Sequence, residues 1–133
     1  MDKITKRTEN RIEAIKVIYE ALMGDVSIDE VISRKESFEK EVLDFLELVT
    51  KNDEKITELI KENLKNYSIN RLNILDLAII KLAVAELLEK KTPKAIVINE
   101  ALNITKIYTN VEGNNQVKFN NRLLDNICKS LGL

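Results

Sequence analysis

Residues 72–88 read LNILDLAIIKLAVAELL, and this stretch determines what kind of fold the chain can adopt. At 3.6 residues per turn, its leucine, isoleucine, valine and alanine side chains cover nearly the whole circumference of a helix. Asp76, Lys81 and Glu86 interrupt the apolar surface at steps of five, which places them at different angles. We therefore expect a helix buried among other helices, without a single polar site shared by these three residues.

On both sides of this stretch, apolar residues recur at helical spacing, with no strand-like alternation. Gly24 and Asp25 are expected to end a first helix, and Thr92 with Pro93 to begin another. The apolar positions of the outer helices are Ile12, Ile15, Tyr19 and Leu22; Phe38, Val42, Phe45, Leu46 and Val49; Ile56, Leu59, Ile60 and Leu64; Ile96, Val97, Ala101, Ile104 and Tyr108; and Phe119, Leu123, Ile127 and Leu131. The pattern predicts an all-α protein with six or seven helices. We expect one domain, residues 1–133, in which two small helical bundles share the central apolar helix.

The composition leaves little room for catalysis or cofactor binding. The 133 residues include no histidine, three glycines and a single cysteine, Cys128. Histidine-dependent catalysis, histidine-containing zinc sites and glycine-rich phosphate loops are thereby excluded, and we expect neither a metal nor a cofactor. Cys128 falls at the spacing of a buried small hydrophobe. The sequence has no secretory signal and no apolar run long enough to span a bilayer, so we expect a soluble cytoplasmic protein.

Charge is unevenly distributed along the chain. Residues 1–20 hold five basic and four acidic groups, residues 21–66 seven and twelve, and residues 67–133 nine and six. The two ends are therefore positive and the middle is negative. This arrangement suits a polyanionic partner, although solvated helix faces also produce such blocks.

Two motifs near the C-terminus are more specific than these general features. After Pro93 the chain reads IVINEA at residues 96–101, and KFNNRLLD follows at residues 118–125. Near the N-terminus, Arg7, Arg11, Ala14, Ile18 and Tyr19 add a basic opening that leads into a helix. Together these strings resemble the NusB-type transcription antitermination factors, and the resemblance spans nearly the whole chain. The sequence departs from the family pattern in two places. Family members often carry further arginines where this chain has Thr8, Glu9 and Asn10, and glycine is common at the position of Arg122.

The resemblance implies an all-helical adaptor and not an enzyme. It implies binding of a boxA-type single-stranded RNA from ribosomal RNA leaders, together with the NusE-type ribosomal small-subunit protein, and association with the elongating RNA polymerase. The phosphate-binding or base-binding residues that it indicates are Lys3, Lys6, Arg7, Arg11, Lys118, Phe119, Asn120 and Asn121. Tyr19 and Asp76 correspond to the protein-partner surface. In such a site, cations bind phosphates and an aromatic ring stacks on an unpaired base.

Several alternatives follow from the residues themselves. Phe119 lies in helical register with Leu123 and Ile127, so a core role competes with base stacking. Tyr19 also suits the core, and Asn99 and Glu100 suit structural hydrogen bonds better than ligand contacts. A helical interaction module without RNA, acting as a dimer or scaffold, is the alternative function. A pair of catalytic carboxylates such as Glu86 and Glu100 has little support. The RNA hypothesis requires the cationic start and the Phe119 region to converge on one surface.

Overall fold

The computed structural model describes residues 5–35, 37–65, 68–110, 113 and 115–133, and all structural statements refer to these ranges. They form seven α-helices and one short 3-10 helix, with no strand among them. In chain order the elements are α1 (Lys6–Gly24), α2 (Ile28–Ser33), α3 (Lys40–Lys51), α4 (Asp53–Asn63), η1 (Ile69–Arg71), α5 (Ile74–Glu89), α6 (Lys94–Tyr108) and α7 (Asn115–Ser130). The all-α prediction is confirmed.

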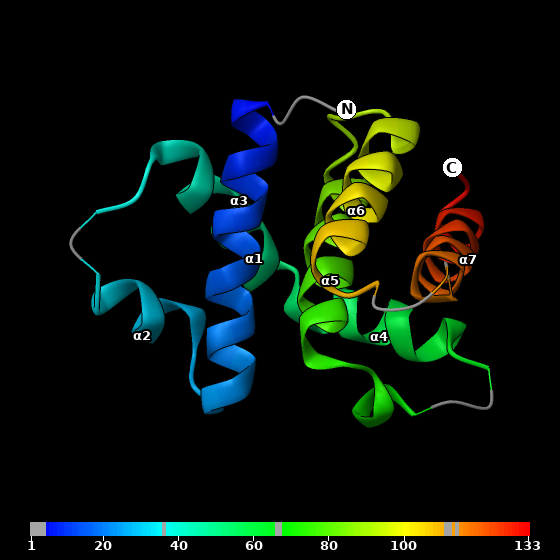
Figure 1. Cartoon of the computed structure of the whole chain (residues 1–133), viewed down its shortest axis with the longest axis horizontal. Coiled ribbons are helices and arrows are strands. Elements are labelled where there is room, and N and C mark those ends of the chain that lie inside the picture. Colours follow the sequence, from blue (N-terminus) through cyan, green and yellow to red (C-terminus); the bar gives the residue numbers. More distant parts are fainter. Residues whose placement is uncertain (1–4, 36, 66–67, 111–112, 114) are drawn as a thin grey trace.

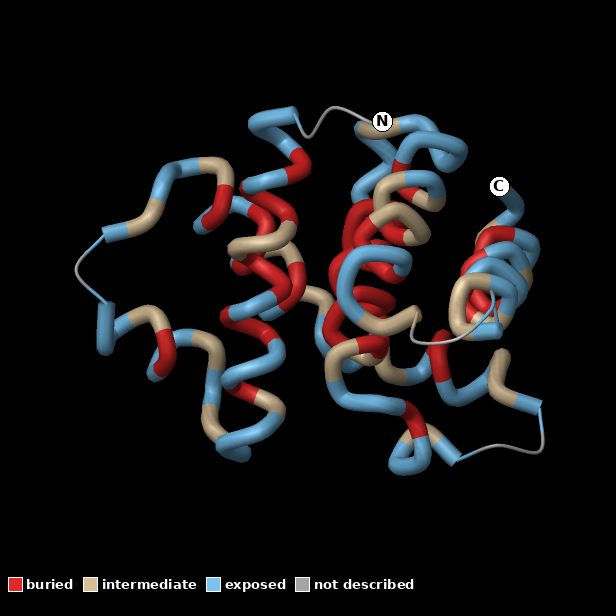
Figure 2. The backbone as a smooth tube through the Cα atoms, in the orientation of Figure 1, coloured by how far each residue is buried: buried red, intermediate tan, exposed pale blue. Residues whose placement is uncertain are grey.

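Helix α5 lies at the centre, as residues 72–88 predicted. It packs against α1 and α3 on one side and against α4, α6 and α7 on the other (Figure 1). Every residue from Ala78 to Leu87 is buried, and the buried part of the chain follows α5 and the inner faces of its neighbours (Figure 2). The two groups of helices that share α5 are the two small bundles expected from the sequence.

Local capping explains where α1 begins and ends. The Thr5 side chain accepts a hydrogen bond from the Thr8 amide, and Asp25 closes the helix in the left-handed conformation with φ 52°. At the next connection, the Ser27 hydroxyl accepts from the Glu30 amide and caps α2. Helix α6 follows Pro93 one residue later than expected, with Pro93 itself as the N-cap residue.

Asp76, Lys81 and Glu86 of α5 are all buried, and each has a different partner. Asp76 binds Asn120 of α7, Lys81 binds Asp53 of α4, and Glu86 binds Arg11 of α1. The prediction that they share no site is confirmed. Cys128 is also buried, and burial raises the pKa of its thiol. None of the described helices combines the length and apolar character needed to cross a membrane.

Candidate nucleic-acid interface

The first turn of α1 presents two of the predicted RNA-binding cations to solvent. Lys6 and Arg7 are both exposed, but each already faces a carboxylate. Lys6 Nζ lies 2.7 Å from Glu39 Oε1, and Arg7 Nε lies 3.2 Å from Glu41 Oε2. The hydrogen bond to Glu39 raises the pKa of Lys6 and lowers that of Glu39. Bound phosphates would have to compete with these carboxylates. The predicted contact Lys3 lies outside the described residues.

Arg11 has a different environment, and the expectation that it contacts RNA needs correction. Only 3% of the residue is exposed. Its guanidinium donates two hydrogen bonds to Glu86, at 2.8 and 2.9 Å, and a third to Glu100 Oε1 at 2.8 Å. It also lies 5.4 Å from the centre of the Phe45 ring. Burial alone would lower the pKa of Arg11, but these two carboxylates outweigh burial and raise it. Arg11 therefore joins α1 to α5 and α6 and does not face solvent.

The same contacts explain the two glutamates considered as a catalytic pair. Glu86 and Glu100 both bind Arg11, and Glu100 additionally accepts a 2.6 Å hydrogen bond from the Thr8 hydroxyl. Their carboxylates neutralise a buried cation, as ionised groups in protein interiors require. Glu100 thus has the structural role expected for it. Asn99, for which the same role was expected, is exposed.

At the start of α7, successive motif residues point in different directions. Lys118 and Asn121 are exposed, and Phe119 is partly buried and packs against the hydrophobic core. The Phe119 ring is thus neither sealed inside nor fully presented to solvent. Lys118, Phe119 and Asn121 stay in the candidate interface.

Asn120 is fully buried, which corrects its assignment as an RNA contact. The Asn120 Nδ2 group donates hydrogen bonds to Asp76 Oδ1 and to Thr105 Oγ1, each 3.1 Å long. The Asn120 Oδ1 atom accepts a hydrogen bond from Gln116 Nε2. Asp76 is only 2% exposed, so its assignment to a partner surface is also wrong. Burial raises the pKa of Asp76, against the opposing hydrogen bonds from Thr109 and Asn120. This polar network attaches α7 to α5 and α6.

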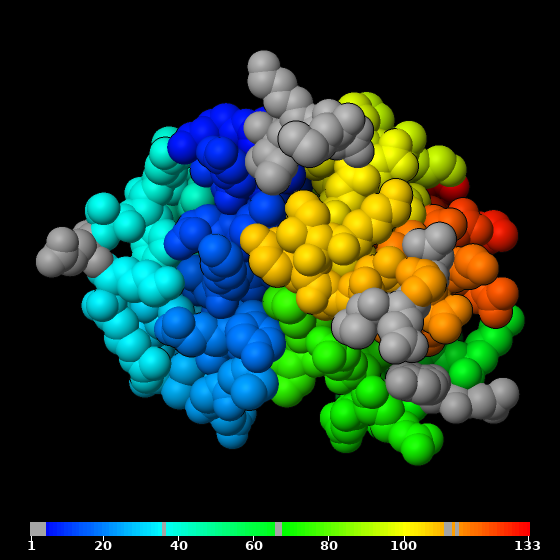
Figure 3. All heavy atoms as spheres, in the orientation of Figure 1, coloured from blue at the N-terminus to red at the C-terminus, as the bar shows by residue number. Residues whose placement is uncertain are grey.

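The cationic start of α1 and the start of α7 do not meet directly, contrary to the expectation of convergence. Helix α6 lies between α1 and α7 on the face seen in Figure 3. One flank of α6 binds α1 through Glu100, and the other flank binds α7 through Thr105. The candidate interface is therefore composed of two regions that flank α6.

A groove of about 540 Å³ runs along the first of these flanks, and we call it the α1–α6 groove. Arg7 and Lys91 supply positive charge to its walls, and Ile96, half exposed, supplies an apolar surface. The full lining is Thr5, Arg7, Arg11, Lys91, Thr92, Pro93, Ile96, Asn99 and Glu100. The cations of this groove suit the phosphates of a single strand.

Tyr19 lies at the other end of α1 and lines a hollow of about 380 Å³. Met23, Ile74 and Tyr108 contribute further exposed apolar surface to it. We call this surface the apolar hollow. Clustered exposed apolar side chains are typical of protein–protein contacts. The location of Tyr19 therefore suits the partner-binding role expected for it, although that role stays a prediction.

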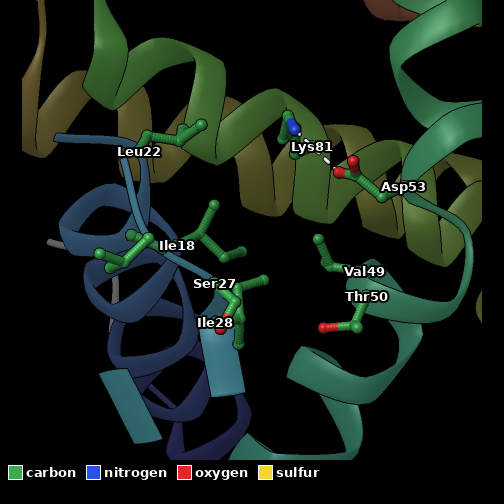
Figure 4. A pocket seen from close by; sticks show the side chains of 10 residues that line it. Ile18, Leu22, Ser27, Ile28, Val49, Thr50, Asp53 and Lys81 are labelled. Atoms are coloured by element: carbon green, nitrogen blue, oxygen red, sulfur yellow. Dashed lines mark hydrogen bonds and ion pairs between the residues drawn. The ribbon is translucent and has the colours of Figure 1, made fainter. Parts of the chain in front are cut away.

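A cavity of about 320 Å³ between α1, α2 and the junction of α3 and α4 has a different character (Figure 4). Ile18, Leu22 and Val49 form much of its wall, and the Lys81–Asp53 ion pair, 2.9 Å long, closes one side. None of the predicted RNA-binding residues lines it. Across the described residues, no group of three or more cysteine, aspartate or glutamate side chains could hold a metal ion.

Helical register could have identified the buried motif residues in advance. Arg11 precedes Ile15 by four positions and Ile18 by seven, and all three are buried. Asn120 stands in the same relation to Leu124 and Ile127. Residues at these spacings share one helix face, so both polar residues face the core. The groove residues Lys91 and Ile96 and the hollow residues Met23, Ile74 and Tyr108 carried no comparable signal, because these surfaces form only when helices from distant parts of the sequence pack together.

Comparison with known proteins places this architecture in a family. The family model described as NusB family matches residues 8–129. The transcription antitermination protein NusB of Listeria innocua is 32% identical over 128 residues, covering 92% of this chain and 96% of that protein. The protein of the same name from Clostridium tetani is 30% identical over 137 residues, covering 94% and 88%.

Solved structures agree with the sequence relationships. NusB of T. maritima superposes with a TM-score of 0.78 at 29% identity, covering 96% of this chain and 93% of the other. A chain in the crystal structure of a plectonemic RNA supercoil gives a TM-score of 0.77 at 25% identity, covering 94% and 95%. Sequence motifs, helix order and three-dimensional arrangement thus lead to the same conclusion: the chain belongs to the NusB family.

Proposed function

We propose that this protein is a transcription antitermination factor that binds a boxA-type single-stranded RNA together with a NusE-type ribosomal small-subunit protein. The main support is the similarity to transcription antitermination proteins over nearly the whole chain. The complex would join the elongating RNA polymerase in the cytoplasm, and the protein's part in it involves no catalytic step. All of residues 1–133 act as one RNA-binding domain in this proposal.

In this proposal, RNA contacts the residues that face outward on either side of α6. Arg7 binds a phosphate at the α1–α6 groove, Lys6 binds another beside it in the first turn of α1, and Lys3 extends the same basic segment of the sequence. At the start of α7, Lys118 binds a phosphate, Phe119 stacks on an unpaired base and the Asn121 amide hydrogen-bonds a base edge. Exposure of Lys118 and Asn121 and partial exposure of Phe119 support this assignment.

The protein partner occupies the apolar hollow in this proposal. Tyr19 is 36% exposed and Met23 is 57% exposed. Both side chains therefore offer apolar surface that a partner can bury. The hollow lies where the end of α1 meets the start of α5 and the end of α6. A partner bound there would lie next to the α7 segment proposed to hold RNA, because α7 begins beside the end of α6.

A titration with labelled boxA-type RNA, with and without the NusE-type protein, tests the proposal. Lys118→Gln should weaken binding and reduce its dependence on salt, because one phosphate contact is lost. The matched control is Lys129→Gln, which removes the same charge near the other end of α7, where Lys129 pairs with Asp125. Equal affinities for the two variants would contradict a phosphate contact at Lys118.

Phe119→Ala tests stacking in the same titration. Loss of one stacked base is expected to cost about 1–3 kcal/mol of binding free energy. A melting temperature close to the original would assign the loss to stacking, and a collapse in melting temperature would assign Phe119 to the core. If the protein binds no RNA at any salt concentration but forms dimers or binds a protein partner, the RNA-free interaction module is the correct function.

A further inference from the structure

Three lysines surround the turn between α5 and α6, and none of them is among the residues assigned to RNA above. Lys90, Lys91 and Lys94 are all exposed. They line a hollow of about 300 Å³ together with Leu87, Thr92, Pro93 and Leu133. We call these three residues the α5–α6 lysines. They place three positive charges within five consecutive residues of sequence.

The α5–α6 lysines have fewer carboxylate partners than the cations of α1. Lys6 and Arg7 lie 2.7 and 3.2 Å from glutamate oxygens of the segment that starts α3. By contrast, neither Lys90 nor Lys94 has a carboxylate of a described residue within ion-pair distance, and Lys91 has one at 3.7 Å, Glu89. An incoming phosphate therefore competes with less protein charge at the α5–α6 turn than at the start of α1.

Lys90 also adopts a backbone conformation that does not suit lysine. Its φ is 63°, in the left-handed region, where it ends α5. Glycine or asparagine adopts this conformation at lower energy, because the side chain of other residues crowds the backbone there. A cation at this position costs conformational energy, and the fold gives no ion pair in return among the described residues.

The positive surface continues from these lysines toward both parts of the proposed interface. Lys91 lines the α1–α6 groove together with Arg7. Along α6, Lys94 and Lys106 are exposed, and the single carboxylate of the helix, Glu100, is bound to Arg11 and Thr8. Helix α6 occupies the face between α1 and α7 (Figure 3). A strand crossing this helix would thus meet cations and no unpaired carboxylate of α6.

We propose that Lys90, Lys91 and Lys94 bind the phosphates of RNA that flanks the boxA-type element. This inference rests on the proposed function and adds a second phosphate-binding surface to it. From Lys94 to Thr105, beside the start of α7, is about 17 Å along the helix axis. That distance corresponds to roughly five stacked nucleotides at 3.4 Å each. RNA containing only the element would reach Lys91 at the edge of the α1–α6 groove but end before Lys90 and Lys94, and a longer RNA would reach all three.

Two RNAs test the proposal with the full-length protein: the boxA-type element alone, and the same element with ten uridines on each side. The variant is K90Q/K94Q, which leaves Lys91 of the α1–α6 groove in place. The control, K51Q/K55Q, removes two exposed lysines at the end of α3 and the start of α4 that have no carboxylate of a described residue in ion-pair distance. At 0.1 M salt each lost phosphate contact should reduce affinity roughly fivefold, with the salt slope falling by about 0.7 per contact.

We expect the original protein and the control to bind the extended RNA more tightly than the short one. The α5–α6 variant should lose most of that difference while binding the short RNA normally. Equal behaviour of the two double variants on the extended RNA would overturn the proposal. Polyglutamate and free oligouridine can be added as competitors of the extended RNA. If both displace it equally well, the proposal is also overturned, because the lysines would then be a general anion surface.

Lys90→Gly separates binding from folding. Relief of the left-handed conformation should raise the melting temperature, while loss of the cation lowers affinity for the extended RNA by roughly fivefold. Opposite changes in the two measurements cannot arise from misfolding. Unchanged affinity with a higher melting temperature would contradict the proposal at this residue. If Phe119→Ala weakens binding and the lysine variants do not, only this inference fails; if no RNA binds at all, the proposed function fails with it.

Discussion

Near the start of α1 the most deeply buried polar residue is a charged arginine, whereas near the start of α7 it is a neutral asparagine. Arg11 is held by two carboxylates, Glu86 and Glu100. Asn120 faces one carboxylate, Asp76, and no cation among the described residues lies in ion-pair distance of that group. In the first site two opposite charges compensate a buried cation. In the second, hydrogen bonds alone support a carboxylate that burial disfavours.

Each of these helix starts therefore contains two kinds of residue: buried ones that attach the helix to the core, and exposed ones that the helix presents to solvent. In both segments, neighbours of the buried residue face outward: Lys6 and Arg7 on α1, Lys118 and Asn121 on α7. Motif residues adjacent in sequence thus have different tasks, and substitution of one class should affect folding while substitution of the other affects binding.

Replacement of Arg11 should have the largest effect on stability. Arg11→Met keeps the aliphatic stem but leaves Glu86 buried without a cation, and Glu100 loses one of its partners. Breaking a buried ion pair in this way costs about 3–5 kcal/mol of unfolding free energy. Urea denaturation followed by circular dichroism measures the loss. Arg7→Ala is the control, because exposed ion pairs are worth at most about 1 kcal/mol. Similar losses for the two variants would contradict the distinction.

Replacement of Asn120 should have an intermediate effect. Asn120→Leu preserves size but removes the donor to Asp76, leaving a buried carboxylate short of one hydrogen bond. The expected loss is about 1–3 kcal/mol of unfolding free energy. Asn121→Ala, one position along the same helix and exposed, should change stability by no more than about 0.5 kcal/mol. If urea denaturation gives both variants the same stability, the network around Asn120 does not hold α7.

The sequence was sufficient for the fold because one helix carried the decisive pattern. Apolar residues around the whole circumference of residues 72–88 required a central helix, and α5 is that helix. The steps of five between Asp76, Lys81 and Glu86 correctly predicted separate sites. These inferences depend only on helix geometry and need no knowledge of which helices are neighbours.

The candidate site was less predictable, because exposure depends on tertiary partners. Arg11 and Glu86 are 75 positions apart, and Asp76 and Asn120 are 44 apart. Helical register places Arg11 and Asn120 on the core-facing side of their helices, but no local pattern indicates that they meet Glu86 and Asp76. The family resemblance and the chemistry of basic and amide side chains pointed instead to RNA. Arg11 and Asn120 were misassigned to RNA for this reason, and Asp76 was misassigned to the partner surface on the resemblance. Lys6, Arg7, Lys118 and Asn121, which have no buried partner, are exposed as expected.

The smallest effect is expected from Asp76→Asn, which retains an acceptor oxygen for the Asn120 amide and removes the charge. Burial raises the pKa of Asp76 in the folded protein above its ordinary value of 3.8. The folded state therefore holds this proton more tightly than the unfolded state. The stabilising contribution of the protonated carboxyl is complete below pH 3.8, and it is lost as pH rises through the higher pKa of the folded state.

Consequently, Asp76→Asn should be more stable than the original protein at pH 7, where the original carries a buried ionised carboxylate, and the advantage should shrink as pH falls toward 3.8. Unfolding free energies of both proteins, measured in urea at a series of pH values, give the difference directly. Asn121→Asp provides the control, since an exposed carboxylate at the neighbouring position of α7 should titrate with little effect on stability. A variant that is less stable than the original at pH 7 would mean that the charged hydrogen bonds from Asn120 and Thr109 outweigh burial. The two helix starts would then be anchored in the same way, each by a buried charge that its partners fully compensate.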